Sequence, residues 1–266
     1  MKIARTVAEV RQAADCCKVE KARLGLVPTM GAFHDGHVSL FRAARAECDK
    51  VVVSLFVNPA QFAPHEDLAR YPRDETRDAE LAEDEGVDIL FAPPADELYP
   101  TGFHTWVDPE GTGAEGVRRP DHFRGVATVC VKLFNIVQPD VAYFGQKDAQ
   151  QAAIVRQLIR DLNLELELRV VLTVRDPDGL ALSSRNTYLS ADERLRALTL
   201  PRALRAGREA YADGADPVAA ARAAFNGLDP DYVEVLDLGN AKLLAAAARV
   251  GETRLIDNVV LEGELT

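Results

Sequence analysis

Long apolar runs are absent from the 266-residue sequence. A helix that crosses a membrane needs about 20 consecutive apolar residues, and no stretch approaches that length. The first residues, Met1 to Arg5, are not followed by the apolar segment of a secretory signal peptide. We therefore expect no membrane-spanning segment and no secretion signal.

Paired cysteine spacings are also lacking. The four cysteines stand at positions 16, 17, 48 and 130, and none forms a Cys-x-x-Cys pair. Adjacent cysteines such as Cys16 and Cys17 are a poor arrangement for zinc, and nothing in the spacing indicates a disulfide framework. These features favour a cytoplasmic location.

Positive charge is in deficit. The sequence has 31 Lys and Arg against 42 Asp and Glu, which gives a formal net charge of −11. This balance disfavours nonspecific binding to nucleic acid or to anionic membranes, and so neither is an expected partner. It still permits a locally basic pocket for an anionic substrate.

The stretch from Leu24 to Leu40 carries the first functional signal. An apolar run predicts a buried strand over 24–27, and Pro28 is expected to end it because proline cannot donate to a central ladder. Helical spacing begins at His37, so His34-Asp35-Gly36-His37 lies at a helix N-terminus. That end of a helix suits phosphate. A purely structural histidine pair or a weak metal site is the alternative at this point.

Alternating patterns predict an α/β fold, a Rossmann-like doubly wound parallel sheet with a second, smaller α+β domain. The expected strands cover 24–27, 50–57, 87–91, 141–144 and 164–174, and the expected helices cover 6–21, 37–48, 74–85, 124–137 and 148–162. The turn at 176–179 is the expected boundary, which gives domains 1–175 and 176–266. The smaller domain should hold a helix over 190–212, another after Asp216, and strands over 232–238 and 253–261.

Polar side chains follow several of these strands. Asn58 and Gln61 come after the strand over 50–57, at the edge where ligands gather in open α/β sheets. Residues 145–148 form a second polar turn, and residues 183–186 place two hydroxyls, a guanidinium and an amide together, which suits phosphate oxygens. Turn chemistry and a polar linker are the alternatives for these segments.

Residues 111–116 formally match Gly-x-Gly-x-x-Gly. No clear buried strand precedes them, and Pro120 follows closely, so the context of a dinucleotide site is missing. We expect a mobile glycine-rich loop there. Arg118 and Arg119 stand beside it, where an anion could enter.

Four motifs stand in order along the chain, with two shorter ones that support them: P-T-M-G-A-F-H-D-G-H, F-V-N-P-A-Q-F, F-G-Q-K-D-A-Q-Q and L-A-L-S-S-R-N, then R-P-D-H-F at 119–123 and R-L-I-D-N at 254–258. Together they closely resemble the pantothenate synthetase (pantoate–β-alanine ligase) family, over nearly the whole chain. The first and fourth also resemble the nucleotide signatures of the wider nucleotidyltransferase and class I synthetase superfamily.

The resemblance implies an ATP-dependent condensation of pantoate with β-alanine through an enzyme-bound pantoyl adenylate, with release of AMP and pyrophosphate. It also implies magnesium with ATP, a homodimer and a C-terminal domain that acts as a lid. By the family pattern the catalytic residues are His34, His37, Lys147 and Arg185. ATP is bound by these four and by Met30, Gly145, Asp148, Val174, Leu182, Ser183 and Ser184. Pantoate or β-alanine contacts Met30, Asn58, Gln61, Tyr71, Arg119 and Gln151. Asp78 is the implied magnesium ligand.

Three positions depart from the family pattern: Gln146, Ala149 and Leu182. None of them removes a proposed charge donor, so they bear on pocket shape rather than on the reaction. The main competing function is a nucleotidyltransferase that acts on a phosphorylated acceptor, which the paired amides Gln61 and Gln151 disfavour. A nicotinamide oxidoreductase is disfavoured by the misplaced glycine motif, and a catalytically silent binding module by the intact donor set.

Overall fold

The computed structural model describes residues 1–64, 66–110 and 113–265, and the chain divides into two compact units. The first unit contains Met1–Phe144 and Gln151–Val171, and the second contains Gly145–Gln150 and Leu172–Thr266. The boundary after residue 175 stays a prediction. None of the helices in the described ranges is long and apolar enough to span a membrane.

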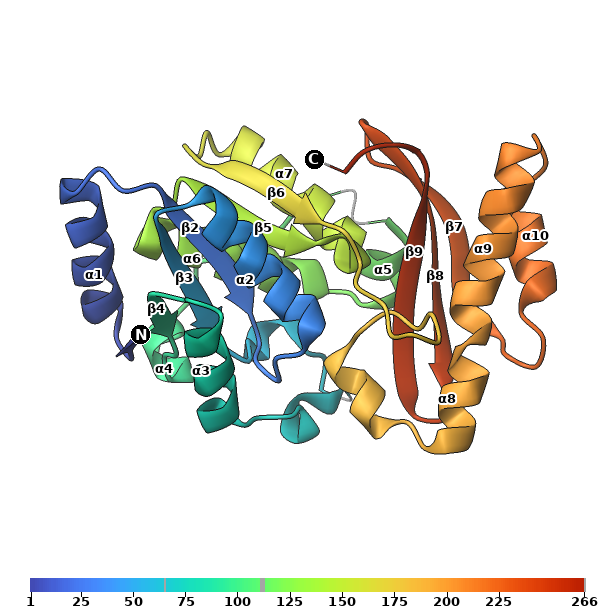
Figure 1. The fold of residues 1–266 in the computed structure, drawn as a ribbon, viewed down its shortest axis with the longest axis horizontal. Helices are drawn as coiled ribbons and strands as arrows, with labels where there is room; N and C mark the ends of the chain where they lie inside the picture. The colour runs from blue at the N-terminus through green and yellow to red at the C-terminus, as the bar shows by residue number, and fades with distance from the viewer. Residues whose placement is uncertain (65, 111–112, 266) are drawn as a thin grey trace. The chain divides into compact units, whose positions relative to one another are not determined.

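The first unit is built on a six-stranded sheet in the order β1-β4-β3-β2-β5-β6, with helices on both faces (Figure 1). The pairings of β1 with β4, β4 with β3, β3 with β2, and β2 with β5 are parallel. This confirms the predicted doubly wound sheet. Its strands are β1 (Lys2–Ala4), β2 (Leu24–Thr29), β3 (Lys50–Leu55), β4 (Ile89–Phe91), β5 (Val141–Gly145) and β6 (Glu167–Val171). The longer helices are α1 (Val7–Val19), α2 (Asp35–Glu47), α3 (Glu75–Asp84), α6 (His122–Val137) and α7 (Ala149–Asp161). Short helical segments are η1 (Pro59–Gln61), η2 (Asp67–Arg70), α4 (Ala95–Leu98) and α5 (Gly113–Arg118).

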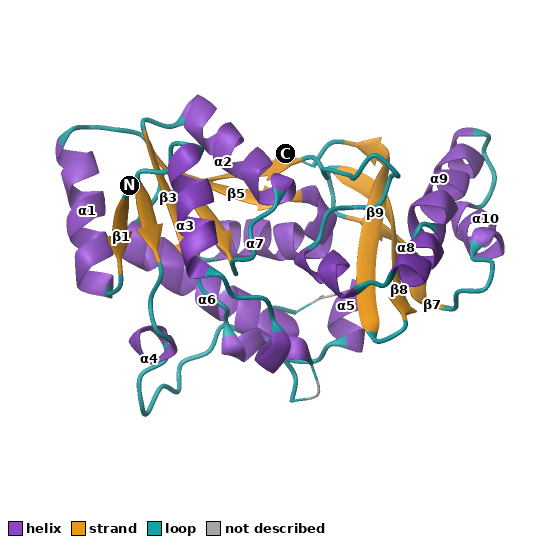
Figure 2. Cartoon of the chain, turned by 60° about the horizontal axis from the view of Figure 1, so that its bottom comes forward, coloured by secondary structure: helices purple, strands orange, loops and turns teal. Residues whose placement is uncertain are grey.

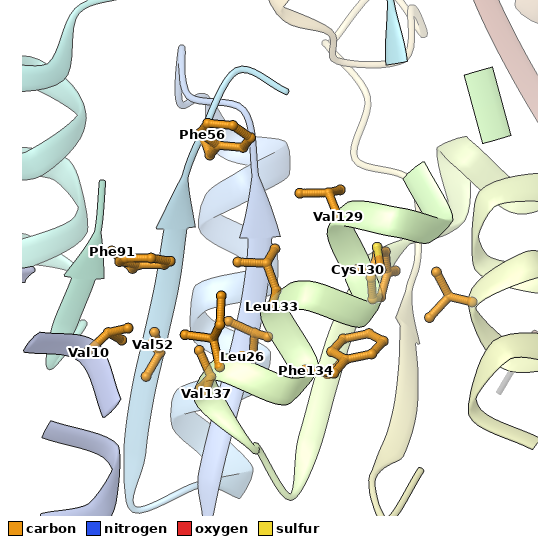
Figure 3. Close-up of a cluster of buried hydrophobic side chains, with 14 of the residues drawn as sticks. Val10, Leu26, Val52, Phe56, Phe91, Val129, Cys130, Leu133, Phe134 and Val137 are labelled. Atoms are coloured by element: carbon orange, nitrogen blue, oxygen red, sulfur yellow. The ribbon is translucent and has the colours of Figure 1, made fainter. Parts of the chain in front are cut away.

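The four central strands, β2 to β5, are buried on both faces, as expected for nearly continuous apolar runs in a parallel sheet. Val52 of β3 joins Leu26 of β2 in a cluster with α1, α6 and α7 (Figure 3). Val51 and Val53 point to the opposite face and pack in the cluster that contains α2 and α3. The period-two alternation of a strand thus places one hydrophobic core on each side of the sheet.

Pro28 does not end β2, contrary to the prediction. It lies inside the strand and is in register with Ser54 of β3. Successive N–H groups of a strand point to opposite sides: the Leu24 N–H donates to Asp140 on the β5 side, and the Thr29 N–H donates to Ser54 on the β3 side. The Pro28 nitrogen therefore faces β5, and the described pairing of β2 with β5 stops at Leu26. Proline thus leaves the pairing with β3 intact, and any bond that it removes is one to β5, beyond Leu26.

The prediction of a glycine-rich loop at 111–116 is wrong in part. Residues Gly113–Arg118 form the short helix α5, and Gly111 and Thr112 lie outside the described residues. Helix α6 follows at once, with Asp121 at its N-cap in the left-handed conformation (φ 68°). Pro120 sits in the turn between the two helices, where it interrupts neither.

A charged cluster holds η1 against α6. Arg119 makes a two-pronged ion pair with Glu66, and one of its N–H groups also reaches the Gln61 carbonyl at 3.3 Å. The His122 ring lies between them: Nδ1 is 2.9 Å from the Gln61 carbonyl oxygen and Nε2 is 3.1 Å from Arg119. A carbonyl oxygen can only accept and a guanidinium can only donate, so His122 is neutral with its proton on Nδ1. Gly125 completes the contact, because a Cβ there would lie 2.3 Å from the Ala60 carbonyl oxygen.

The second unit is a three-stranded antiparallel sheet, β7 (Pro230–Asp237), β8 (Ala241–Val250) and β9 (Thr253–Gly263), covered by helices (Figure 2). The predicted smaller α+β unit is therefore confirmed. Its helical segments are η3 (Gln146–Asp148), η4 (Ser184–Tyr188), α8 (Ala191–Ala197), α9 (Thr199–Ala212) and α10 (Pro217–Ala224). The predicted single helix over 190–212 is wrong, because it breaks at Leu198. Pro201 has no N–H to donate to the Ala197 carbonyl, so the first helix ends and α9 begins at Thr199.

Strand β8 is the longest of the elements that the sequence pattern does not predict, which also include β1 and α4. Its sequence, A-K-L-L-A-A-A-A-R-V, is rich in alanine, which favours a helix. The strand pairs along its length with β7 and β9, and its small side chains let α9 come close. A Cβ on Gly207 of α9 would lie 2.2 Å from a methyl carbon of Leu244, which shows how close the approach is.

We expect the charged cluster around His122 to make stability depend on pH. Burial, followed by the positive charge of the neighbouring Arg119, lowers the pKa of His122 from 6.5 to about 4 in the folded protein. Between these values the unfolded chain binds the proton and the folded chain does not, so stability falls as pH decreases from 6.5 to about 4. The loss should be about 1–3 kcal/mol.

Urea unfolding of wild type and of His122→Asn between pH 5 and 7 measures this effect. Asparagine keeps an N–H near the position of Nδ1 but cannot be protonated, so the slope should be smaller in the variant. Most carboxylates titrate below this window, which separates their contribution from that of His122. Identical slopes in the two proteins would contradict the assignment.

Candidate active site

His34 and His37 cap the N-terminus of α2 reciprocally. His34 Nδ1 accepts the Gly36 N–H at 3.1 Å, and His37 Nδ1 accepts the His34 N–H at 3.3 Å. The two rings lie side by side, with centroids 4.2 Å apart. An Nδ1 that accepts cannot carry the proton, so each neutral imidazole has its N–H at Nε2. The capping therefore fixes both rings as Nε2 donors at a helix N-terminus, the end that favours anions.

The loop before these histidines is held by Asp78 of α3. Its two carboxylate oxygens accept the N–H groups of Ala32 and Phe33, each at 2.7 Å. Ala32 has a φ of +53°, a conformation that residues other than glycine rarely adopt, so these two bonds support a strained turn. Burial raises the pKa of Asp78, although both backbone N–H groups favour its charged form. Asp78 is thus a buried support for the loop that leads to His34.

Asn58, Gln61 and Met30 form a chain of side-chain contacts. Asn58 Nδ2 donates to the Gly125 carbonyl at 3.1 Å and to Gln61 Oε1 at 3.0 Å. Gln61 Nε2 then lies 3.0 Å from the sulfur of Met30. Since each amide has one donor end and one acceptor end, these contacts orient the Gln61 amide with its NH₂ group toward Met30. The structure therefore brings together three of the predicted substrate residues.

A cavity of about 400 Å³ lies at the carboxyl ends of β2 and β3 in the first unit. Met30, Gly31 and Asp78 line it, with residues 55–57 at the end of β3. The carboxyl edge of a parallel sheet is where ligands bind in this class of fold, and the volume suits a small molecule.

The other predicted substrate residues of this unit have different surroundings. Tyr71 is buried, and its ring packs edge-on to Phe62. Gln151 lies in the first turn of α7 and is partly exposed. Arg119 is bound by Glu66 and lies 3.6 Å from Glu115, so its charge is balanced within the protein. The geometry of Arg119 indicates that it supports η1.

The second unit holds the remaining predicted site residues. Gly145 precedes η3, in which Lys147 Nζ lies 3.2 Å from an Asp148 carboxylate oxygen. Leu182 is paired with Val174, because its N–H donates to the Val174 carbonyl at 3.0 Å. Ser183 caps η4, where its Oγ accepts the Arg185 N–H at 3.3 Å, and this short helix also contains Ser184.

The residues that support these segments were not predicted as site residues. Glu66 and His122 support η1, and Asp257 and Asn258 contact the segments that carry Lys147 and Leu182. His122, Asp257 and Asn258 stand within the motifs at 119–123 and 254–258, which was the available signal. Their partners are 61 to 112 positions away in the sequence, so the pattern alone cannot assign them.

Comparisons with known proteins agree with this arrangement. The family model described as pantoate-beta-alanine ligase matches residues 2–260. The pantothenate synthetase of Chloroflexus aurantiacus is 52% identical, with 99% of both chains covered. The pantothenate synthetase of Moorella thermoacetica is 50% identical, with 98% of this chain and 99% of that one covered.

Solved structures give the same result. Pantothenate synthetase from Thermus thermophilus is similar with a TM-score of 0.92 and 44% identity, over 98% of this chain and 99% of that chain. Pantoate-beta-alanine ligase from Francisella tularensis, in complex with beta-gamma ATP and beta-alanine, has a TM-score of 0.85 and 34% identity, over 99% of both chains. With a match that spans nearly its whole length, this chain belongs to the pantoate–beta-alanine ligase family.

Proposed function

We propose that this chain condenses pantoate with β-alanine in two steps, with ATP as the second substrate of the first step. In that step a pantoate carboxylate oxygen attacks the α-phosphorus of ATP, and the bond to pyrophosphate breaks. In the second step the amine of β-alanine attacks the acyl carbon of pantoyl adenylate. The carbon–nitrogen bond forms and the amine loses a proton. The bond between the acyl carbon and the oxygen that links it to AMP breaks, and AMP leaves with that electron pair. The enzyme is thus an AMP-forming ligase.

The observation that carries the proposal is the reciprocal cap of His34 and His37, which presents two neutral Nε2 donors at the start of α2. Negative charge moves onto the phosphate oxygens as pyrophosphate leaves, and preorganised donors stabilise that charge without a reorganisation cost. Lys147 and Arg185 supply positive charge, and Ser183 and Ser184 supply hydroxyl donors. Pantoate is itself the nucleophile, so the protein needs no nucleophilic side chain.

For the substrates, Gln61 and Gln151 bind pantoate, and Met30, Asn58, Tyr71 and Arg119 complete its surroundings. Support comes from the fixed Gln61 amide, whose NH₂ group can donate to a hydroxyl or carboxylate of pantoate. Gly145 and Asp148 meet the ribose of ATP, and the paired backbones of Val174 and Leu182 meet adenine.

Magnesium enters the proposal with the phosphates of ATP. Asp78 alone does not make a protein metal site, and each of its carboxylate oxygens already uses one of its two acceptor positions for a backbone N–H group. In the described part of the chain no three His, Cys, Asp or Glu side chains gather where they could hold a metal ion. By the family resemblance we also propose a homodimer. A cytoplasmic location is proposed from the four free cysteines.

The two-step scheme predicts which substrates each product requires. Pantoate alone should support exchange of labelled pyrophosphate into ATP, whereas AMP should accumulate with turnover only when β-alanine is added. An assay with ATP and each acid separately, followed by both together, measures this. A covalent acyl-protein species found by mass spectrometry would sink the scheme.

Replacing either capping histidine with asparagine should slow the first step at least about tenfold, since loss of one charge-stabilising donor costs on the order of 10² to 10³ in rate. Asparagine keeps an acceptor for the helix N-terminus, so the melting temperature should change little. His34→Asn and His37→Asn are compared in pyrophosphate exchange and in a thermal melt. His104→Asn, at an exposed histidine outside the proposed site, is the control. Full exchange activity in both capping variants would leave the histidines as structural residues only.

Gln61→Ala should weaken pantoate binding more than ATP binding. Leaving a polar group of the bound ligand without its buried hydrogen-bond partner weakens the binding free energy by roughly 1–3 kcal/mol, which corresponds to roughly a tenfold to hundredfold higher Kd. Gln151→Ala should behave in the same way. Gln157→Ala, on the same helix as Gln151 but outside the proposed site, should change neither affinity. Titration calorimetry measures both ligands, and weakened ATP binding with unchanged pantoate binding would refute the assignment.

A further inference from the structure

The motif at 254–258 has no role in the reaction proposed above. Its last two residues, Asp257 and Asn258, are polar yet only 2% exposed within β9. Burial of a charge and an amide is costly unless each polar atom has a partner. The partners of these two side chains therefore show what the motif does.

Asn258 holds the turn that carries Lys147. Its Nδ2 group donates to two backbone carbonyls, that of Gln146 at 2.9 Å and that of Lys147 at 3.0 Å. Its Oδ1 atom accepts Gln146 Nε2 at 3.1 Å. One amide thus satisfies three groups of η3, and the carbonyl of Lys147 itself is among them.

Asp257 holds the second segment through Arg175. Its carboxylate makes a two-pronged ion pair with that guanidinium, at 2.6 and 2.9 Å. Arg175 also donates to the Gly179 carbonyl at 3.2 Å, and its own backbone forms a bridge with Ala181. The turn that leads to Leu182 is therefore tied to β9.

The two anchors are also tied to each other. The Asn258 N–H donates to Asp257 Oδ1 at 2.8 Å, and Arg175 reaches the Asn258 carbonyl at 3.3 Å. Two successive residues on one strand, which point to opposite faces, thus hold two segments that each bear proposed ATP ligands.

We infer that Asn258 is a positioning residue for Lys147 and that Asp257, through Arg175, positions the segment from Val174 to Arg185. The inference rests on the proposed role of Lys147 in the first step. It gives the motif at 254–258 a function: it fixes the second unit's phosphate donors with respect to each other. The flexible lysine side chain needs such an anchor, because a cation placed about 1 Å away from its working position loses much of its effect.

Asn258→Ala and Asn258→Asp form the principal test. The alanine variant removes every contact of the amide, whereas aspartate keeps the shape and replaces the donor with an oxygen that faces two carbonyls. Both variants should slow pantoate-dependent pyrophosphate exchange at least about tenfold. The second step, started from preformed pantoyl adenylate and β-alanine, should change less than threefold, because no pyrophosphate departs there.

Asp216→Ala is the matched control for loss of stability. Asp216 caps α10 in the same unit by accepting the N–H groups of Val218 and Ala219, and it lies outside the proposed site. It should lower the melting temperature and leave exchange unchanged. If Asn258→Ala behaves like this control, Asn258 is only structural and the inference is overturned.

A double-mutant cycle shows whether Asn258 acts through Lys147. Lys147→Ala should itself slow exchange, and adding Asn258→Ala to it should slow exchange less than twofold further. Fully multiplicative effects would overturn the inference. Unchanged exchange in Lys147→Ala would instead refute the proposed role of Lys147, and the inference would fall with it. Slow exchange in Lys147→Ala with normal exchange in both Asn258 variants would overturn the inference alone.

Discussion

Buried backbone groups that leave regular structure must find hydrogen-bond partners, and the whole candidate site depends on this requirement. Most of the proposed site residues stand on irregular segments after strands, where no ladder supplies such partners. Asp78 satisfies the loop before His34, His122 and Arg119 satisfy the carbonyl of Gln61, and Asn258 satisfies the turn of Lys147. Each side chain comes from an element distant in sequence. The donors are thus held rigidly by the same hydrogen bonds that satisfy the buried backbone groups of these segments.

Much of the fold could be predicted because hydrophobic periodicity is local. The parallel strands of the first unit and the helices between them follow from runs of neighbouring residues. The errors arose where distant contacts override local preference. Alanine-rich β8 is a strand because β7 and β9 pair with it and α9 requires small side chains. Pro28 is accepted in a central strand because its nitrogen faces β5, so that the pairing with β3 is kept while the described pairing with β5 ends at Leu26.

For the candidate site, residue type and position along the chain identify the direct donors but not their supports. His34 and His37 are visible in the sequence because they stand together at a predicted helix start. Which nitrogen carries the proton is not visible, since it follows from the hydrogen bonds of the folded turn. Arg119 illustrates the limit: the family resemblance predicts a cation near the substrate, whereas the fold shows that Glu66 balances its charge.

The reciprocal histidine cap also has an electrostatic consequence. A protonated imidazole has no acceptor at Nδ1, so either histidine could become a cation only by giving up its hold on the start of α2. An intact helix start therefore goes together with two neutral rings, each with its N–H at Nε2. Ionic strength screens interactions between charges far more than hydrogen bonds between neutral donors and an oxygen. The donors at the start of α2 are thus nearly indifferent to salt, as long as the cap that orients them is intact.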